Sequence, residues 1–243
     1  MAGHSKWANI KRRKEKVDAQ RGKIFTKVAR EIIVAARQGG GDPETNFRLK
    51  AAITRAKEAN LPNDNIIRAI KRGTGDSAAD ALEEIIYEGY GPGGVAVLMN
   101  VVTDNRNRTV GEIRHIFSRS GGNLGESGCV SWMFEQKGLI LLEKDAVKLD
   151  EDEVMMLALE AGAEDLKTEE DSYEIITSPS DFNSVQDDLV SKGVVIAASE
   201  ITMIPKTYVE LEGKQADQML RLIDALEDHD DIQEVSSNFS EKE

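Results

Sequence analysis

The first strongly periodic part of the chain is predicted to be a helix with one apolar side and one basic side. From residue 23 onward, apolar residues recur every three or four positions, which is the period of an α-helix. These residues are Ile24, Phe25, Val28, Ala29, Ile32, Ala35 and Ala36. Four cations, Lys23, Lys27, Arg30 and Arg37, lie near one line on the opposite side. Gly39-Gly40-Gly41 ends the helix, because glycine readily adopts the conformation that terminates one.

Two further short helices are predicted after these glycines. The second runs from about residue 45 to 60, and it ends at Leu61-Pro62. Asn63 or Asp64 caps the third, which runs through Arg72. The residues expected to point inward are Leu49, Ala52, Ile53 and Ala56 in the second helix, and Ile67 and Ile70 in the third. Three short helices of this kind predict a compact bundle.

After a linker at residues 73–80, the pattern changes from helices to strands. Residues 84–90 and 95–102 are rich in apolar and β-branched residues, and Gly91-Pro92-Gly93-Gly94 joins them. Residues 105–120 have the helical period, and residues 130–134 are expected to form another strand. This part of the chain therefore predicts an α+β domain with an incomplete sheet.

Six elements are predicted in the next region. Strands are expected at 138–143, 163–167, 173–177 and 194–204, and helices at 151–161 and 179–192. The order βαββαβ is typical of the ferredoxin-like fold. A strand at 207–211, a helix at 215–227 and a strand at 232–235 remain, and they could complete the sheet begun at Glu84. The ferredoxin-like unit would then be an insertion. The alternative is a simple tandem of two α+β domains.

Charge is distributed very unevenly along the chain. Residues 1–75 hold 18 Lys and Arg against 7 Asp and Glu, whereas residues 76–243 hold 13 against 37. Such asymmetry suggests that the basic part contacts a nucleic acid or a membrane surface. Because the acidic remainder repels phosphate, it would orient the approach of a polyanion toward the basic part.

The basic part supplies the residues that we expect to bind nucleic acid. Several cations on mobile stems are needed to reach one phosphate backbone. Trp7 could stack on an unpaired base, or it could instead pack the first 20 residues onto the bundle. The first 20 residues could also be a solvated terminus without a partner. The predicted contact set is Lys6, Trp7, Lys11, Arg12, Arg13, Lys14, Lys16, Arg21, Lys23, Lys27, Arg30, Arg37, Arg68, Lys71 and Arg72.

A second basic patch lies within the acidic remainder. It consists of Arg106, Arg108, Arg114 and Arg119, all at or along the helix predicted for residues 105–120. Helix capping accounts for Asp104 or Asn105, but it does not account for four arginines. The patch could bind nucleic acid, contact another domain, or pair with the acidic surface of the chain itself.

The sequence offers no set of residues for catalysis. Residues 89–94 match the pattern G-x-G-x-x-G, but a strand follows them where a dinucleotide-binding loop needs a helix. Residues 121–129 are interpreted as a turn between a helix and a strand, and the acids at 150–153 as the start of a helix. Cys129 and His115 could form a dyad, although no motif supports one and a buried thiol is the simpler interpretation. We therefore expect a protein that is not an enzyme, without metal, cofactor or small-molecule substrate.

The compartment expected for the protein is the cytoplasm. Cys129 is the only cysteine, so no intramolecular disulfide can form, which suits a reducing environment. No apolar run approaches the roughly 18 to 20 residues that cross a bilayer, so no membrane partner is expected.

Several motifs together resemble those of the YebC/PmpR family. They are the opening residues 1–11, Arg21-Gly22-Lys23-Ile24-Phe25, Gly39-Gly40-Gly41-Asp42-Pro43, residues 87–94, residues 104–109 and Gly121-Gly122-Asn123-Leu124-Gly125. The resemblance covers essentially the whole chain. It implies an α+β protein with an N-terminal three-helix bundle followed by two α+β domains, one of them ferredoxin-like and inserted in the other. The implied domains are residues 1–75, residues 80–136 plus 206–238, and the insertion at 137–205.

The resemblance also implies a function in gene expression. Members of the family are described as cytoplasmic, DNA-binding regulators of transcription, and this is the function expected here. The alternative is a ribosome-associated translation factor that binds ribosomal RNA and relieves stalling on proline-rich sequences. The family also includes a mitochondrial translational activator of a cytochrome oxidase subunit. A basic extension with Gly, Ser and Trp suits folded RNA at least as well as duplex DNA.

Overall fold

The computed structural model describes residues 21–75 and 82–242. It confirms an α+β protein that begins with three helices and continues with mixed helices and strands. The chain forms two compact units. Their described residues are 21–75, 82–131 and 213–237 for the first unit, and 132–212 and 238–242 for the second. Within the described ranges, no helix is long and apolar enough to cross a membrane.

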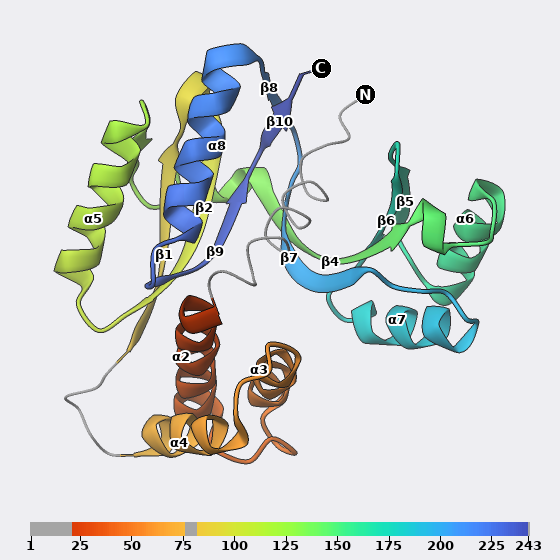
Figure 1. Cartoon of the computed structure of the whole chain (residues 1–243), viewed down its shortest axis with the longest axis horizontal. Coiled ribbons are helices and arrows are strands. Elements are labelled where there is room, and N and C mark those ends of the chain that lie inside the picture. The colour runs from red at the N-terminus through yellow and green to blue at the C-terminus, as the bar shows by residue number, and fades with distance from the viewer. Residues whose placement is uncertain (1–20, 76–81, 243) are drawn as a thin grey trace. The chain divides into compact units, whose positions relative to one another are not determined.

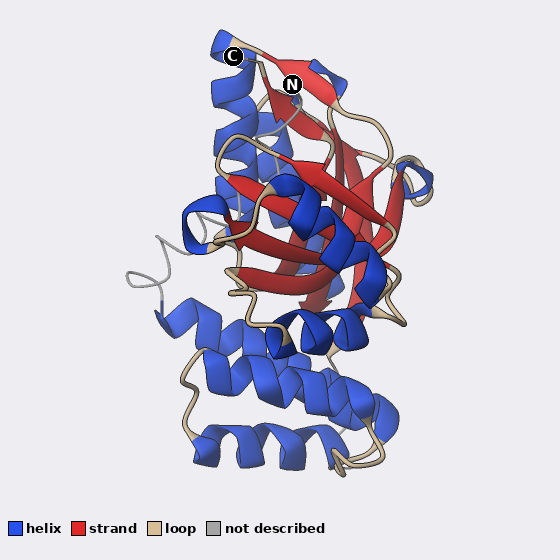
Figure 2. Ribbon diagram, turned by 90° about the vertical axis from the view of Figure 1, so that its right-hand side faces the viewer, coloured by secondary structure: helices blue, strands red, loops and turns tan. Residues whose placement is uncertain are grey.

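The three predicted helices are confirmed as α2 (Arg21–Gly39), α3 (Phe47–Glu58) and α4 (Asn63–Thr74) (Figure 1). The described chain from 21 to 75 is helix and loop only (Figure 2). Its core is apolar, and Ile32, Leu49, Ala52 and Ala56 are fully buried. A Cβ atom at Gly73 would lie 2.5 Å from the carbonyl oxygen of Ile33. Helices α2 and α4 therefore approach each other at a distance that only glycine permits.

The buried side chain of Asn46 connects the end of α2 to the start of α3. Its amide nitrogen donates to the carbonyl oxygens of Ala35 and Gly40, both at 2.8 Å. Its carbonyl oxygen accepts from the backbone N–H of Leu49 at 3.1 Å and so caps α3. One side chain thus satisfies backbone groups at two helix ends that would otherwise lack partners.

Of the two residues of α4 that were expected to point inward, Ile70 packs against the bundle core, but the prediction for Ile67 was wrong. Ile67 is 51% exposed, whereas Ile66, Ala69 and Gly73 are buried. Two adjacent isoleucines fit either of two neighbouring faces, so spacing alone could not choose between them. The predicted cap was also wrong, because Pro62 occupies the N-cap position and makes no side-chain hydrogen bond there.

A four-stranded antiparallel sheet follows in the same unit, in the order β3-β1-β2-β9. Its strands are β1 (Glu83–Tyr90), β2 (Ala96–Thr103), β3 (Asn123–Leu124) and β9 (Ile232–Ser237). Helices α5 (Arg106–Arg119) and α8 (Gly213–Glu227) lie against this sheet (Figure 1). They contribute the buried residues Ile113, Phe117, Met219 and Leu222.

The loop with the G-x-G-x-x-G pattern joins two antiparallel strands, as predicted. Tyr90 of β1 pairs with Ala96 of β2, and the 3₁₀ turn η3 (Pro92–Gly94) lies between them. Gly93 has a φ of 66° and Gly94 a φ of 79°, a conformation that favours glycine. The glycines therefore serve a tight turn.

The strand expected at residues 130–134 was wrong. A 3₁₀ turn, η4 (Ser131–Met133), occupies most of this stretch, and strand β4 begins only at Phe134. The buried carboxylate of Glu88 accepts the backbone N–H groups of Gly128, Val130 and Ser131, each at 2.7 Å. These donors are therefore not available to a strand partner, and the segment turns around the carboxylate.

The second unit contains an antiparallel sheet in the order β5-β6-β4-β7. Its strands are β4 (Phe134–Glu143), β5 (Asp165–Thr168), β6 (Ser172–Thr177) and β7 (Ala198–Pro205). The 3₁₀ turn η5 (Lys144–Ala146) follows β4. Ile140 and Leu142 pack in one buried cluster with α6 (Glu151–Ala161) and α7 (Phe182–Ser191), and Leu139 and Leu141 pack in another. This alternation is the period of a strand that is buried on both faces.

The strand expected at 207–211 does not complete the first sheet. It is β8 (Val209–Leu211), which pairs in parallel with β10 (Phe239–Glu241) in a separate two-stranded sheet. The backbone N–H of Val209 donates to the carbonyl oxygen of Asn238 at 2.7 Å. The strand expected at 232–235 does join the first sheet, as β9 beside β2.

Candidate nucleic-acid interface

Three cations of the predicted stripe on α2 contact the chain's own acidic turn, residues 227–231. The ammonium of Lys27 donates to the carbonyl oxygen of Glu227 at 2.6 Å, and that of Lys23 donates to the carbonyl oxygen of Asp228 at 3.1 Å. Glu227 is the last residue of α8, where carbonyl groups lack partners within the helix and the helix dipole is negative. The lysines therefore satisfy the end of α8.

Arg30 is the most deeply engaged cation of the stripe. Its guanidinium donates to the carbonyl oxygens of Asp230 at 2.8 Å and Val102 at 3.3 Å, and it forms an ion pair with the Asp231 carboxylate. Its side chain is only 19% exposed. A nucleic-acid phosphate would have to replace these contacts before Arg30 could bind it.

Asp231 is the centre of this network and is 3% exposed. Its carboxylate accepts hydrogen bonds from Thr109 at 2.6 Å, Arg108 at 3.0 Å and Thr103 at 3.2 Å, besides Arg30. Burial by itself would raise the pKa of Asp231. Hydrogen bonds from Thr109, Arg30 and Arg108 outweigh burial and lower its pKa to about 2.

All four arginines of the second basic patch are exposed, but one of them forms ion pairs within the chain. Arg108 pairs with Asp104 at 2.9 Å and with Asp231 at 3.0 Å. Arg106, Arg114 and Arg119 are exposed, and none of them forms an ion pair with another residue in the described ranges. Of the three alternatives for this patch, Arg108 therefore shows the third, which is pairing with acidic residues of the chain itself.

Glu112, His229 and Asp231 have potential metal-ligand atoms within 4.8 Å of one another. The side chains are already used in other ways. His229 accepts from the backbone N–H of Asp231 through Nδ1, so its neutral ring carries a proton on Nε2, which lies 2.9 Å from Glu112. Two guanidinium groups also face Asp231. This arrangement suits a hydrogen-bonded ion-pair network better than a cation site.

Cys129 does not have the environment of a nucleophile. Burial raises the pKa of its thiol, and the nearby carboxylates of Glu88 and Glu126 raise the pKa further. A catalytic cysteine needs the opposite, because only the thiolate attacks. The geometry thus favours a structural role for the 121–131 loop, which is arranged around Glu88.

The cations of α4 are more exposed than the engaged cations of α2. Arg68, Lys71 and Arg72 are all exposed. Among the residues that the structure describes, Arg68 and Lys71 have no ion-pair partner. Arg37, the last cation of the α2 stripe, is half-buried and likewise forms no ion pair with a described residue. Arg68, Lys71 and Arg37 can therefore meet a phosphate without first leaving a carboxylate of the described chain.

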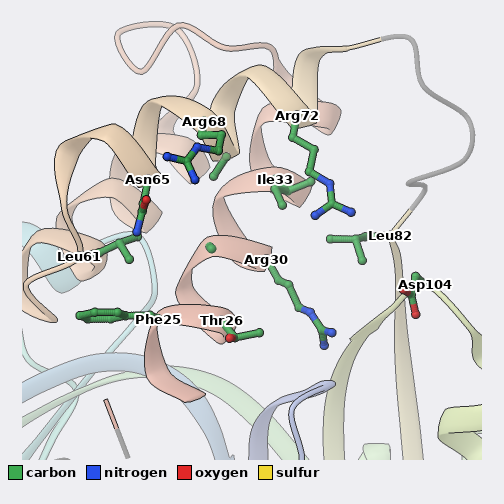
Figure 3. Close-up of a pocket in the computed structure, with 12 residues that line it drawn as sticks. Phe25, Thr26, Arg30, Ile33, Leu61, Asn65, Arg68, Arg72, Leu82 and Asp104 are labelled. Carbon is green, nitrogen blue, oxygen red and sulfur yellow. The ribbon is translucent and has the colours of Figure 1, made fainter. Parts of the chain in front are cut away.

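A cavity of about 450 Å³ lies beside these cations (Figure 3). Arg68 and Arg72 extend from α4, Phe25 and Leu61 lie on a second side, and Leu82 lies on a third. Arg30, held by Asp231, borders the same space. The cavity therefore combines apolar walls with guanidinium groups.

The structure describes only some of the predicted contact residues. Lys6, Trp7, Lys11, Arg12, Arg13, Lys14 and Lys16 lie outside the described residues, as does the side chain of Arg21. The predicted set missed Asp231, Asn65 and the apolar wall of the cavity. The run Asp228-His229-Asp230-Asp231 was a signal for the first of these, because it is complementary in charge to the α2 stripe.

Comparison with known proteins gives full-length matches. Residues 5–76 match the family described as the TACO1/YebC protein N-terminal domain, and residues 82–239 match the TACO1/YebC second and third domain. A protein of Pelotomaculum thermopropionicum, named "Probable transcriptional regulatory protein", is 66% identical over 98% of both chains. One of Carboxydothermus hydrogenoformans with the same name is 60% identical, again over 98% of both.

The fold is similar to that of a solved structure. The crystal structure of a conserved hypothetical protein from Aquifex aeolicus superposes with a TM-score of 0.82 and 48% identity, over 94% of both chains. The resemblance inferred from the motifs is thereby confirmed along both compact units. This chain belongs to the TACO1/YebC family.

Proposed function

We propose that the protein is a non-enzymatic, cytoplasmic regulator of gene expression that binds DNA. Its relatives carry the name of transcriptional regulators. The observation that carries the proposal is the set of exposed cations on α4, of which Arg68 and Lys71 have no carboxylate partner in the described chain. They belong to a bundle whose described residues, 21–75, hold 12 Lys and Arg against 5 Asp and Glu.

The proposed contact surface is centred on α4. Arg68, Lys71, Arg72 and Arg37 would bind phosphates directly, together with the basic residues predicted in the first 21 positions. Lys23, Lys27 and Arg30 contribute by holding the acidic turn. The acidic second half of the chain keeps a polyanion away from the rest of the molecule.

Ribosomal RNA is the second candidate partner, with the protein acting as a ribosome-associated translation factor. The cavity beside α4 supports this candidate, because unpaired nucleotides that can enter a cavity are a regular feature of folded RNA. Crosslinking in cells with ultraviolet light, followed by sequencing of the bound nucleic acid, separates the two partners. Promoter DNA supports a transcriptional regulator, and ribosomal RNA supports the translation factor.

We also infer a three-part architecture for this regulator, with domains at 1–75, at 80–136 plus 206–238, and at 137–205. The last would be a ferredoxin-like insertion. Strand order β5-β6-β4-β7 with helices α6 and α7 supports this assignment. The discontinuous first unit also supports it, because the chain leaves that unit at 131 and returns at 213.

The salt dependence of binding tests the proposed surface. The logarithm of the association constant should fall with the logarithm of salt concentration by about 0.9 per phosphate contact on duplex DNA. Replacing Arg68, Lys71 and Arg72 with Gln should weaken binding to all sequences alike and reduce this slope by about 2 to 3. Fluorescence anisotropy with a labelled duplex measures both quantities.

Two further variants make this test specific. The change Lys148→Gln/Lys214→Gln removes cations from the acidic part and should leave the slope unchanged. Replacing Arg106, Arg114 and Arg119 with Gln shows whether the second basic patch contributes. Equal slopes for the wild-type protein and the α4 variant would rule out the proposed surface.

A further inference from the structure

The cavity beside α4 has both apolar and basic lining residues, and the proposed phosphate contacts use only the basic ones. Apolar side chains border it on two sides, with Phe25 and its aromatic ring beside Leu61 on one and Leu82 on the other. Another carries the guanidinium groups of Arg68 and Arg72, and Asn65 adds an amide (Figure 3). A ligand that fits this cavity needs both a flat apolar part and an anionic part.

The size of the cavity excludes a double helix but accommodates a small group. Its volume of about 450 Å³ is within the usual range for sites that enclose small ligands. A duplex keeps its bases stacked inside and exposes only their edges, in the grooves of a convex surface. Only a nucleotide that has left the stack can place its base in such a space.

The side chains are suited to the two parts of a nucleotide. Phe25 is half-buried and packs on the bundle core, so its ring is held in place while one side borders the cavity. Base stacking on an aromatic ring tolerates any base. Arg68 has no carboxylate partner among the described residues, which leaves its guanidinium able to pair with a phosphate.

Acid and base groups for chemistry on the ligand are scarce in this cavity. Among the described residues that line it, Asp104 is the one carboxylate, and that group already pairs with Arg108 at 2.9 Å. Arg30 is likewise held by Asp231. The lining is therefore suited to holding a ligand, without a group placed to transform it.

We infer that this cavity binds one unpaired nucleotide, with the base against Phe25 and its phosphate on Arg68 and Arg72. The inference rests on the proposed nucleic-acid binding and adds a preference for an unpaired site. The unpaired nucleotide could belong to RNA or to distorted DNA, and the same cavity chemistry would serve both.

The test compares labelled hairpins that are fully paired with hairpins that carry one bulged nucleotide, made both as RNA and as DNA. At constant salt, the full-length protein should bind the bulged hairpin about tenfold more tightly than the paired one, which is the scale of one stacked base. A bulge without a base should lose this preference. If the preference for the bulge is larger for the RNA hairpins, the nucleotide belongs to RNA; if it is larger for the DNA hairpins, it belongs to DNA.

Matched variants locate the site. Phe25→Leu keeps an apolar side chain on the core but removes the ring, and it should abolish the preference, as should Arg68→Gln. The controls are Phe47→Leu, because Phe47 is 81% exposed elsewhere in the bundle, and Lys71→Gln, which removes a neighbouring charge that does not line the cavity. Both controls should keep the preference. Circular dichroism verifies that each variant is folded.

The possible failures are distinguishable. Equal affinity for bulged and paired hairpins would overturn the cavity as a nucleotide site but leave nucleic-acid binding intact. A preference that survives both Phe25→Leu and Arg68→Gln would also overturn it. No binding to any hairpin at low salt would refute the proposed function itself.

Discussion

Arg30 and Asp231 are 201 residues apart in the chain, and their guanidinium and carboxylate groups form a hydrogen-bonded ion pair. Asp231 also accepts from Arg108 and Thr109, so a single carboxylate connects α2, α5 and the start of β9. The basic face of α2, which looks like a surface for an external polyanion, is thus partly neutralised within the fold. By contrast, the exposed cations Arg68 and Lys71 of α4 have no ion-pair partner among the described residues.

Replacing Asp231 with Asn should destabilise the protein strongly. The change leaves the largely buried Arg30 without its carboxylate partner, and breaking a buried pair typically costs about 3 to 5 kcal/mol. Urea unfolding followed by circular dichroism measures the loss. The control is Asp230→Asn, since the Asp230 residue is exposed and only its backbone oxygen contacts Arg30. Equal stability of the two variants would contradict the central role of Asp231.

The carboxylate of Asp231 should make the stability of the protein depend on pH. Its pKa is lowered from 3.8 to about 2 in the folded protein, so the unfolded chain binds the proton more readily. The stabilisation is complete above about pH 4 and is lost as the pH falls through about 2, and its size is about 2 kcal/mol. The difference in unfolding free energy between wild-type protein and Asp231→Asn should therefore shrink between pH 5 and pH 2. A constant difference would show that Asp231 does not titrate as described.

Glu88→Gln should loosen the loop of residues 125–131. The carboxylate accepts three backbone N–H groups, whereas the amide of Gln has one acceptor oxygen and places an NH₂ group against donors. Hydrogen bonds to a charged group contribute about 1.5 to 3 kcal/mol, so a loss of this size is expected. Hydrogen exchange at Val130 and Ser131 should accelerate. The exposed Glu126→Gln should leave the exchange of these amides unchanged.

The thiol of Cys129 should react slowly in the folded protein. Burial and the nearby Glu88 raise its pKa, which lowers the thiolate fraction at pH 8. Alkylation by iodoacetamide should thus be slower than in urea, and faster in Glu88→Gln than in the wild-type protein. Mass spectrometry over time gives the rates. Equally fast alkylation in the folded and the unfolded chain would contradict the raised pKa.

Asn46→Ala should destabilise the helical bundle. It removes the cap of α3, which is worth about 1 kcal/mol, and leaves the carbonyl oxygens of Ala35 and Gly40 without their side-chain donor. We expect a total loss of about 2 to 3 kcal/mol in thermal or urea unfolding. Thr45→Ala, at an exposed neighbouring position, is the control and should stay within about 0.5 kcal/mol of the wild type.

Local pattern was sufficient wherever one periodicity was unambiguous. The three helices of the bundle, the turn at Gly93 and the capped helix after Asn105 were all predictable, because each depends on neighbours a few residues away. Adjacent Ile66 and Ile67 gave two equivalent choices, and packing against α2 decided between them. The stretch 130–134 had the composition of a strand, but the N–H groups of Val130 and Ser131 donate to Glu88, which lies more than 40 residues earlier.

The sequence by itself determined the family, the α+β class and the uneven charge, because these depend on residue types and their order. It could not determine which cations remain accessible, since this depends on carboxylates and carbonyls that the fold brings from about 200 residues away. Only the tertiary structure placed Arg30 against Asp231 and left Arg68 beside a cavity. The physical reason is that a charge becomes available to a partner only after the contacts within the chain have been satisfied.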